Sequence, residues 1–230
     1  MKLFETPQRM PMVFFVLNIL LLNGCVQKFS HVNDTLKEGL FGIEDITISA
    51  EEVSRLPYAS SYMRFNQGPR VFMVLALAEP NPSNGQQQLK WLSSDGAMVV
   101  TEGGRVVKTL NLAKSNLARR QPLDLDVEIS TFPSWSQHST WLERYDWSLN
   151  NHYGHIGKAQ LTFIGKSKVI STLWQDELNH WQEEIVFEKL NRTLRNQYWV
   201  DSQGYIMKSI QYLGPDMSRV EVEILKPFKE

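Results

Sequence analysis

The chain has 230 residues, of which 42% are hydrophobic and 21% are charged, and its formal net charge is −1. This length and composition suit one globular domain with a substantial core, or at most two small ones. A nucleic-acid partner is not expected, because it normally requires a basic surface. A single cysteine excludes an internal disulfide.

The N-terminus has the pattern of a secretory signal peptide. Lys2 and Arg9 precede or border an apolar run, Met10–Leu22, which is too short to span a bilayer comfortably but suits the apolar region of a signal peptide. The sequence Leu21-Leu22-Asn23-Gly24-Cys25 follows and resembles a bacterial lipobox, with Asn23 as a departure because small residues are commoner there. We predict a lipoprotein signal peptide over residues 1–24.

The only cysteine of the chain, Cys25, lies where a lipobox requires a thiol. A diacylglyceryl group on sulfur, with a further acyl chain such as palmitate on the new amino terminus, would anchor the protein stably, at roughly 0.8 kcal/mol per buried CH₂. The alternatives are a cleaved secretory signal with an incidental cysteine, or a short membrane anchor. Val26 follows, not the aspartate that favours the inner membrane, so we expect the periplasmic face of the outer membrane.

A polar tether is predicted over residues 25–38, and one β-rich domain over residues 39–230. Ser49 and Glu52 have the spacing of a capping box and predict a short helix through about Leu56, ended by Pro57. Beyond it the chain reads as strands and tight turns. Arg70–Glu79 holds a continuous apolar run, which suits a strand that is buried on both faces.

Three segments then predict an antiparallel meander joined by glycine turns at Asp95-Gly96 and Gly103-Gly104. They are Gln88–Ser93, Ala97–Glu102 and Arg105–Leu112. Ala113–Arg120 is expected to form one or two helical turns. Pro122–Ser130 alternates apolar and acidic residues, so a half-buried strand is the simplest interpretation.

The C-terminal part predicts further hairpins. Asn179–Thr193 could be helical. A strand is favoured because Trp181, Glu183, Ile185 and Phe187 alternate with polar neighbours. The predicted fold class is mainly β: a curved antiparallel sheet or half-barrel with a few short helices. The predicted strands are Gly157–Gly165, Lys168–Trp174, Trp181–Leu190, Asn196–Val200, Tyr205–Leu213 and Ser218–Leu225.

Several stretches, in their order and spacing, resemble the YjbF/GfcB family of bacterial lipoproteins, found with group 4 capsule and related exopolysaccharide operons. The likeness covers most of the mature chain and includes no catalytic motif. It implies a β-rich lipoprotein that assists polysaccharide secretion or assembly, with no known enzymatic activity. The stretches are Leu56-Pro57-Tyr58-Ala59-Ser60, Gly68-Pro69, Leu75-Ala76, Leu89-Lys90-Trp91, Asp95-Gly96, Gly104-Arg105-Val106-Val107-Lys108-Thr109, Asn196-Gln197-Tyr198-Trp199-Val200-Asp201, Lys208-Ser209-Ile210-Gln211 and Lys226-Pro227-Phe228.

Two groups of polar residues were considered as sites. Asp124, Asp126 and Glu128 would share one face of a strand, as a glycosidase or calcium site might require, but the solvent face of an amphipathic strand is the simpler explanation. His152 and His155 have a spacing that zinc ligands can adopt, but a zinc site needs three or four ligands. We therefore predict no catalytic, cofactor or metal residues.

Trp135, Trp141 and Trp147 fall at six-residue steps, and indole rings are stacking surfaces for sugars. A glycan groove is one interpretation of these residues, and packing against a curved sheet is the favoured alternative.

Three functions from different classes remain open. The first is a non-enzymatic, lipid-anchored protein that assists polysaccharide export by binding glycan or an export-operon protein. The second is a carrier or chaperone of a lipid-like ligand, whose mark would be a large cavity lined by Leu, Phe and Met. The third is a glycan-modifying hydrolase, which requires two carboxylates converging in a cleft, one with a raised pKa.

Overall fold

A computed structural model describes residues 45–113, 116–123, 140–148 and 151–229. All of these belong to one compact unit, Gly42–Glu230. The predicted signal peptide, Cys25 and the whole predicted tether belong to a second unit, Met1–Phe41, which lies outside the described residues. Within the described ranges, no helix is both long and apolar enough to cross a membrane.

The first described element is the helix α3 (Ala50–Arg55), and it begins with the predicted capping box. The Ser49 hydroxyl accepts a hydrogen bond from the Glu52 backbone N–H at 3.3 Å, and the Glu52 carboxylate accepts one from the Ser49 N–H at 2.9 Å. These two bonds satisfy backbone donors that the helix itself leaves unpaired. Leu56 caps the C-terminal end with extended backbone, directly before Pro57.

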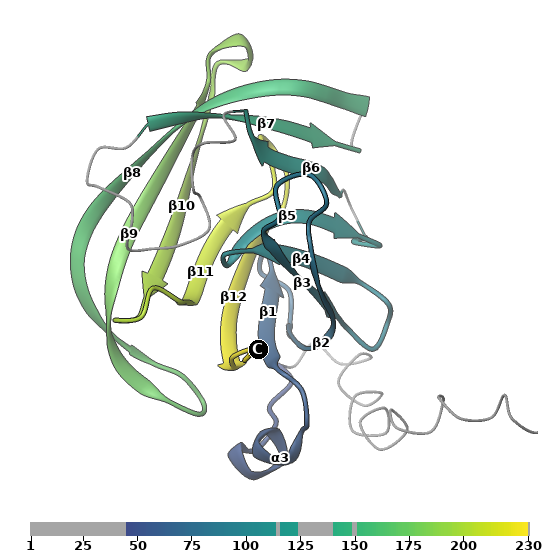
Figure 1. Ribbon diagram of the computed structural model, residues 1–230, viewed down its shortest axis with the longest axis vertical. Coiled ribbons are helices and arrows are strands. Elements are labelled where there is room, and N and C mark those ends of the chain that lie inside the picture. The colour runs from purple at the N-terminus through teal and green to yellow at the C-terminus, as the bar shows by residue number, and fades with distance from the viewer. Residues whose placement is uncertain (1–44, 114–115, 124–139, 149–150, 230) are drawn as a thin grey trace, which may run out of the picture. The chain divides into compact units, whose positions relative to one another are not determined.

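Twelve antiparallel strands follow and form one sheet, so the predicted fold class is confirmed (Figure 1). The strand order is β5-β4-β3-β2-β1-β12-β11-β10-β9-β8-β7-β6. The strands are β1 (Ser60–Phe65), β2 (Arg70–Pro80), β3 (Gln87–Leu92), β4 (Met98–Glu102), β5 (Arg105–Leu110), β6 (Leu117–Pro122), β7 (Thr140–Trp147), β8 (His152–Ile170), β9 (Gln175–Phe187), β10 (Arg192–Val200), β11 (Ile206–Tyr212) and β12 (Arg219–Lys226).

The two edge strands, β5 and β6, come together, so the sheet nearly closes on itself. A side chain bridges the two edges: the Thr109 hydroxyl on β5 accepts a hydrogen bond from the Leu117 backbone N–H on β6 at 2.9 Å. The two edge strands therefore meet through side-chain contacts, while every other neighbouring pair is joined by a backbone ladder.

The predicted meander is confirmed as β3, β4 and β5, with left-handed glycines in both turns. Gly104 has a φ of +78°, and a Cβ atom placed on it would lie 2.6 Å from Cβ of Ile206. Only glycine fits this position, because it tolerates the positive φ and lets the β4–β5 turn approach the start of β11 closely.

The strand predicted over Arg70–Glu79 forms as β2, but it is not buried on both faces, because Ala76 and Leu77 are exposed.

The structure corrects two further predictions of local structure. Gly157–Gly165 and Lys168–Trp174 were predicted as separate strands, but β8 is one strand of 19 residues. Gly165, with a φ of +146°, forms a bulge against β9 instead of ending the strand. The helical turns predicted over Ala113–Arg120 are wrong from Leu117 onward, because those residues form β6.

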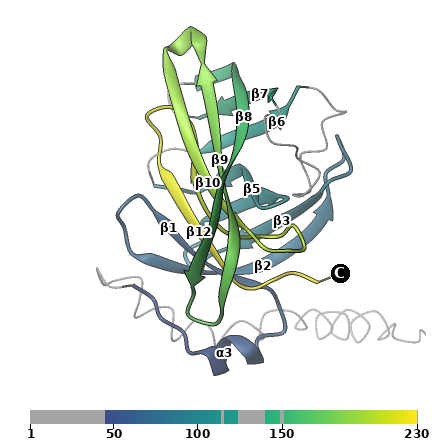
Figure 2. The same cartoon turned by 90° about the vertical axis from the view of Figure 1, so that its left-hand side faces the viewer.

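The predicted strand over Trp181–Leu190 is confirmed up to Phe187, after which Glu188–Leu190 forms a short 3-10 helix. Figure 2 shows β8, β9 and β10 running side by side as a long twisted ribbon.

The interior of the curved sheet is filled with side chains. A single buried cluster contains aliphatic, methionine and aromatic residues from most strands. Its fully buried large members include Met63, Met73, Trp91, Tyr145, Leu161, Ile185, Phe187 and Tyr198. Such burial is the main source of folding free energy.

Candidate functional site

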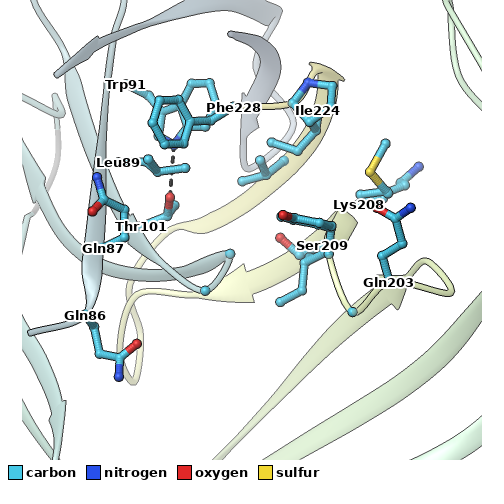
Figure 3. Close-up of a pocket in the computed structure, with 18 residues that line it drawn as sticks. Gln86, Gln87, Leu89, Trp91, Thr101, Gln203, Lys208, Ser209, Ile224 and Phe228 are labelled. Atoms are coloured by element: carbon cyan, nitrogen blue, oxygen red, sulfur yellow. Dashed lines mark hydrogen bonds between the residues drawn. The ribbon is translucent and has the colours of Figure 1, made fainter. Parts of the chain in front are cut away.

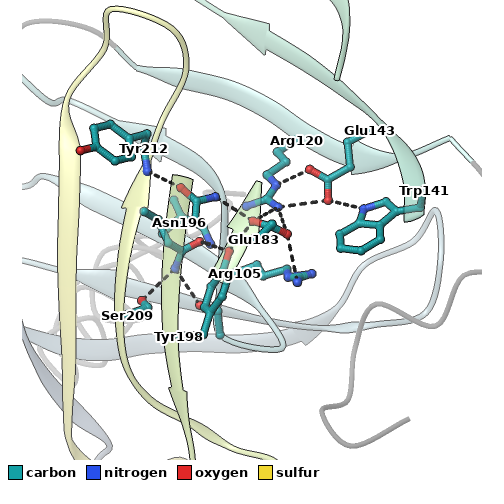
Figure 4. Close-up of polar contacts among 12 residues, drawn as sticks. Arg105, Arg120, Trp141, Glu143, Glu183, Asn196, Tyr198, Ser209 and Tyr212 are labelled. Carbon is teal, nitrogen blue, oxygen red and sulfur yellow. Dashed lines mark hydrogen bonds and ion pairs between the residues drawn. The ribbon is translucent and has the colours of Figure 1, made fainter. Parts of the chain in front are cut away.

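Charged side chains from four strands meet inside the sheet (Figure 4). Arg120 on β6 forms two hydrogen bonds with the Glu143 carboxylate on β7, Nε to Oε2 at 2.7 Å and a terminal nitrogen to Oε1 at 3.0 Å. The same terminal nitrogen lies 2.9 Å from both carboxylate oxygens of Glu183 on β9. All three residues are buried, so Arg120 ties β6, β7 and β9 together in the core.

Glu183 is the centre of this buried charge network. A terminal nitrogen of Arg105 on β5 lies 3.1 Å from its Oε1. Two residues of β10 donate to its Oε2, the Asn196 amide at 2.7 Å and the Tyr198 hydroxyl at 2.8 Å. The network contains two guanidinium and two carboxylate groups, so its formal charges cancel. A buried charge is tolerated when it is paired and hydrogen-bonded in this way.

The electrostatics of the network keep Glu183 ionised. Burial alone raises the pKa of this carboxyl, but the nearby Arg105 and Arg120 charges and the hydrogen bonds from Asn196 and Tyr198 outweigh burial. The net effect lowers the pKa of Glu183 to about 2. Burial, followed by the Glu183 charge, raises the pKa of the Tyr198 hydroxyl, which stays protonated as a donor. This carboxylate is suited to hold strands together and is unsuited to donate a proton.

The buried charge network is not predictable from the linear sequence as a whole, although one signal of it is present in β9. Glu183 stands in the apolar phase of β9, between Trp181 and Ile185. A charged residue in the buried phase of a strand requires a buried partner. Its partners Arg105 and Arg120 lie on β5 and β6, which the linear sequence does not place beside β9.

The structure corrects the glycan-stacking interpretation for two of the three tryptophans. Trp141 is 5% exposed, and its indole N–H donates to the Glu143 carboxylate at 2.7 Å. Trp147 is 3% exposed, and the His155 ring stacks on it at a centroid distance of 4.7 Å. Neither ring has an open face for a sugar, and both belong to the core cluster. Trp135 lies outside the described residues.

The other polar groups considered from the sequence do not form a metal site in the described chain. Nδ1 of His152 lies 3.1 Å from Nε2 of His155. Across the described ranges, no three His, Cys, Asp or Glu side chains are grouped to hold a metal ion. Asp124, Asp126 and Glu128 lie outside those ranges.

A pocket of about 460 Å³ opens at one end of the sheet (Figure 3). Its walls come from turns that are far apart in the sequence: the β2–β3 loop, the β4–β5 turn, the β10–β11 turn and the chain after β12. Its volume is in the range of small-molecule sites. The carboxamides of Gln86, Gln87 and Gln203 line it, together with the aromatic rings of Trp91, Tyr205 and Phe228.

Two buried hydroxyl groups belong to the lining of this end pocket, those of Thr101 on β4 and Ser209 on β11. The Thr101 hydroxyl accepts a hydrogen bond from the Trp91 indole N–H at 3.0 Å. The Ser209 hydroxyl accepts one from the Gln211 side-chain amide at 2.9 Å. Thr101 is 3% exposed and Ser209 is 0% exposed, so both hydroxyls lie behind the surface of the pocket and support its wall from within the sheet.

The end pocket is connected to the buried charge network through Gln211. The Gln211 side-chain oxygen accepts a hydrogen bond from the Val106 backbone N–H at 2.9 Å and lies 3.3 Å from the oxygen of Tyr198, whose single hydroxyl proton is directed to Glu183. The Gln211 amide nitrogen donates to the Gly104 carbonyl at 3.0 Å and to Ser209. Contacts through Gln211 and Tyr198 thus link the wall of the end pocket to Glu183.

A second pocket, of about 650 Å³, lies at the opposite end of the strands. Its lining residues belong to the β1–β2 and β3–β4 turns and to the segment after β5, and they include Asn66, Ser93, Asp95 and Asn111. Ser93 and Asp95 hydrogen-bond to each other and to Ala97 within the β3–β4 turn. Their polar groups are already used to shape that turn, so this pocket is the weaker candidate.

The architecture is that of a known bacterial lipoprotein. The crystal structure of the hypothetical lipoprotein YmcC from Escherichia coli K12 matches it with a TM-score of 0.67 and 30% sequence identity, over 80% of this chain and 91% of YmcC.

Two curated relatives in Escherichia coli K12 are the uncharacterized lipoproteins GfcB and YjbF. The first is 32% identical over 216 residues, covering 90% of this chain and 94% of the relative. The second is 33% identical over 223 residues, covering 94% and 97%. The family described as "Group 4 capsule polysaccharide lipoprotein gfcB, YjbF" matches residues 33–225. The chain belongs to this family, which confirms the resemblance seen in the sequence.

Proposed function

We propose that this protein is a lipid-anchored, periplasm-facing protein of the outer membrane that assists the secretion or assembly of a capsular or extracellular polysaccharide without catalysing a reaction. The observation that carries the proposal is membership of the group 4 capsule lipoprotein family over residues 33–225, nearly the whole chain after the predicted signal peptide. The protein would act by binding the glycan or another protein of the export operon.

The anchor in this proposal is acylated Cys25. The lipobox-like sequence ends at this residue, and the relatives GfcB and YjbF are both named lipoproteins. About twenty residues separate Cys25 from the first described residue, Asp45.

The non-enzymatic part of the proposal is supported by the state of the buried carboxylates. A hydrolytic acid needs a raised pKa and contact with substrate. Glu183 has a lowered pKa, and both Glu183 and Glu143 are bound to Arg120 out of reach of solvent. The Glu183 and Glu143 carboxylates therefore stabilise the fold, and the end pocket is the candidate site for binding a ligand.

The lipid-carrier alternative receives less support from the interior of the sheet. A half-barrel that carries an acyl chain needs a deep apolar cavity, whereas the interior here is filled by the core cluster and the buried charge network. The end pocket has apolar lining from residues that include Leu89, Met207 and Phe228, but it lies at one end of the sheet, and glutamine side chains belong to its lining.

A deletion of the gene in its host tests the proposal. We expect less polysaccharide on the cell surface, measured by immunoblot and by uronic acid or hexose assay of shed polymer. The wild-type gene restores it, and Cys25→Ala moves the protein from the membrane to the soluble periplasmic fraction and restores export poorly. Thr162→Val, on the exposed face of β8, serves as the matched control and restores export fully. Unchanged surface polysaccharide in the deletion strain would contradict the proposal.

A further inference from the structure

We infer that the outer face of β2, β3, β4 and β5 rests on a phospholipid surface, with a row of four apolar side chains in the headgroup region. The inference rests on the proposed function, since it names the face that the lipid-anchored domain turns toward its membrane. It is carried by the register of the apolar row, by the place where the chain enters the fold and by the order of the charges beside the row. The four side chains, which we call the outer row, are Val74, Leu92, Met98 and Leu110.

The outer row is continuous because its members are cross-strand partners on consecutive strands (Figure 1). Leu92 pairs with Val74 on one side and with Met98 on the other, and Leu110 in turn pairs with Met98. Neighbouring strands lie about 4.8 Å apart, so the row runs roughly 14 Å across the sheet. Trp91, next to Leu92, belongs to the core cluster, which places the outer row on the opposite face of the sheet.

The outer row is partly open to solvent. Leu110 is 40% exposed, and the other three members are half-buried. Leu77, the next residue of β2 on this face, is 46% exposed. Apolar side chains that lie side by side on a protein surface typically mark an interaction site.

The same face is already covered where it reaches β1. Tyr62 on β1 pairs with Phe72 on β2, two positions before Val74, and both rings are 1% exposed. The segment before α3 covers them: Ile48 is buried there, and its backbone N–H donates to the Tyr62 hydroxyl at 2.7 Å. The described part of this segment stops short of β3, so the cover ends where the outer row begins.

The chain enters the fold at the same end of the sheet. Asp45 is the first described residue, and its carboxylate accepts a hydrogen bond from the Arg70 backbone N–H at 3.0 Å. Arg70 begins β2 and lies four positions before Val74, which is about 13 Å along the strand. The outer row likewise lies where β3 ends, β4 begins and β5 ends. A segment anchored at Cys25 therefore joins the domain beside the outer row.

The charges beside the outer row follow the order that a lipid surface requires. The next row along the strands contains Lys90 and Lys108, each paired with Val100. The row beyond it contains Glu79 and Glu102, each paired with Gln88. Lys90 forms an ion pair with Glu79, whereas Lys108 is exposed. Lysines beside an apolar surface reach lipid phosphates while their stems stay on that surface, and the carboxylates here lie farther from the lipid.

Fluorescence quenching in vesicles tests the inference. Cys25 is the only cysteine, and its thiol is acylated in the proposed function, so a cysteine introduced elsewhere is the only one that reacts with a fluorescent maleimide. Leu110→Cys places the label on the outer row, and Tyr212→Cys places it on β11, at a similar native exposure of 36%. The full acylated chain is inserted into vesicles of phosphatidylethanolamine with a minor fraction of phosphatidylglycerol, which also contain nitroxide-labelled phosphatidylcholine.

We expect the nitroxide lipid to quench the label at position 110 several-fold more strongly than the label at position 212. Adding Leu92→Gln and Met98→Gln to the Leu110→Cys chain should remove most of this difference, because both changes make the outer row polar. The matched control adds Leu142→Gln and Ile164→Gln, which replace exposed apolar residues on β7 and β8, and should preserve the difference. The comparison of the two label positions does not depend on the folding of these combined variants.

Failure of this inference is distinguishable from failure of the proposed function. Equal quenching at the two positions, or stronger quenching at position 212, would overturn the inference and leave the acyl anchor in place. Shielding of the position 110 label from iodide in the Cys25→Ala chain without vesicles would also overturn it, because the chain itself or a second copy would then cover the row. Reaction of the maleimide with Cys25 in the wild-type chain would reveal a free thiol and overturn the proposed function, and the inference with it.

Discussion

Replacement of Glu183 by glutamine tests the role of the buried charge network directly. The substitution keeps the size of the side chain and removes its negative charge, so the network is left with two guanidinium groups and one carboxylate, that of Glu143, which pairs with Arg120. Glu183 is 0% exposed and is contacted by four side chains. Removing one partner of a buried ion pair typically costs 3–5 kcal/mol, so we expect a loss of about 4 kcal/mol in the free energy of unfolding.

The adjacent residue provides the control for this experiment. Glu184 lies on the outer face of β9, and its carboxylate is 2.9 Å from Arg195 in a solvent-exposed pair. Exposed pairs contribute about 0–1 kcal/mol, so Glu184→Gln should change stability by less than about 1 kcal/mol.

Urea unfolding followed by tryptophan fluorescence measures both variants of the full chain, with the midpoint and slope fitted separately. A loss of about 4 kcal/mol is a large share of the 5–15 kcal/mol that stabilises an ordinary domain. Equal losses in Glu183→Gln and Glu184→Gln would refute the reasoning that the network holds the sheet together.

Two further predictions concern backbone geometry and pH. Gly104→Ala should lower the melting temperature by several degrees, because the new Cβ would lie 2.6 Å from Ile206 and the φ of +78° disfavours any side chain. Gly85→Ala is the control: Gly85 has a similar φ of +71°, but no atom lies within 4 Å of the added Cβ, so the melting temperature should fall less. Calorimetry that ranks the two variants the other way would contradict this. Burial, and then the nearby His152 and Lys189, lower the pKa of His155 below its usual value of 6.5. The His155 side chain therefore binds a proton more readily in the unfolded chain than in the folded one, so the free energy of unfolding falls as the pH drops below 6.5. His155→Gln should remove that part of the fall in urea titrations at stepped pH, and an identical pH profile in the variant would contradict the assignment.

Much of the fold could be predicted because its signals are local. The capping box at Ser49, the turn at Asp95-Gly96 and the alternation around Ile185 each depend on residues within a few positions of one another. The strand end predicted at Gly165 is wrong, because a glycine in a strand pattern can either end the strand or form a bulge within it. The choice between these outcomes depends on pairing with β9, which is not a local property.

The candidate site could not be predicted, because its parts are brought together by strand order and register. Arg120 and Glu183 are 63 positions apart, and they meet because β6, β7, β8 and β9 are consecutive neighbours in one sheet. The walls of the end pocket likewise come from turns and a tail that only the near-closure of the sheet assembles. Indole rings can stack on sugars wherever they are exposed, but the linear sequence does not show that Trp141 and Trp147 face the core.

The junction of β5 and β6 has a consequence for how the molecule comes apart. To separate any other two neighbouring strands, a whole row of backbone hydrogen bonds must break. Between β5 and β6, the contact consists of the Thr109 hydroxyl and neighbouring side chains. Arg105 on β5 and Arg120 on β6 both pair with Glu183, so these salt bridges connect the two edge strands at the place where no backbone ladder joins them. Opening should begin there, with amide protons of Arg105–Leu110 and Leu117–Pro122 exchanging with solvent before those of the central strands.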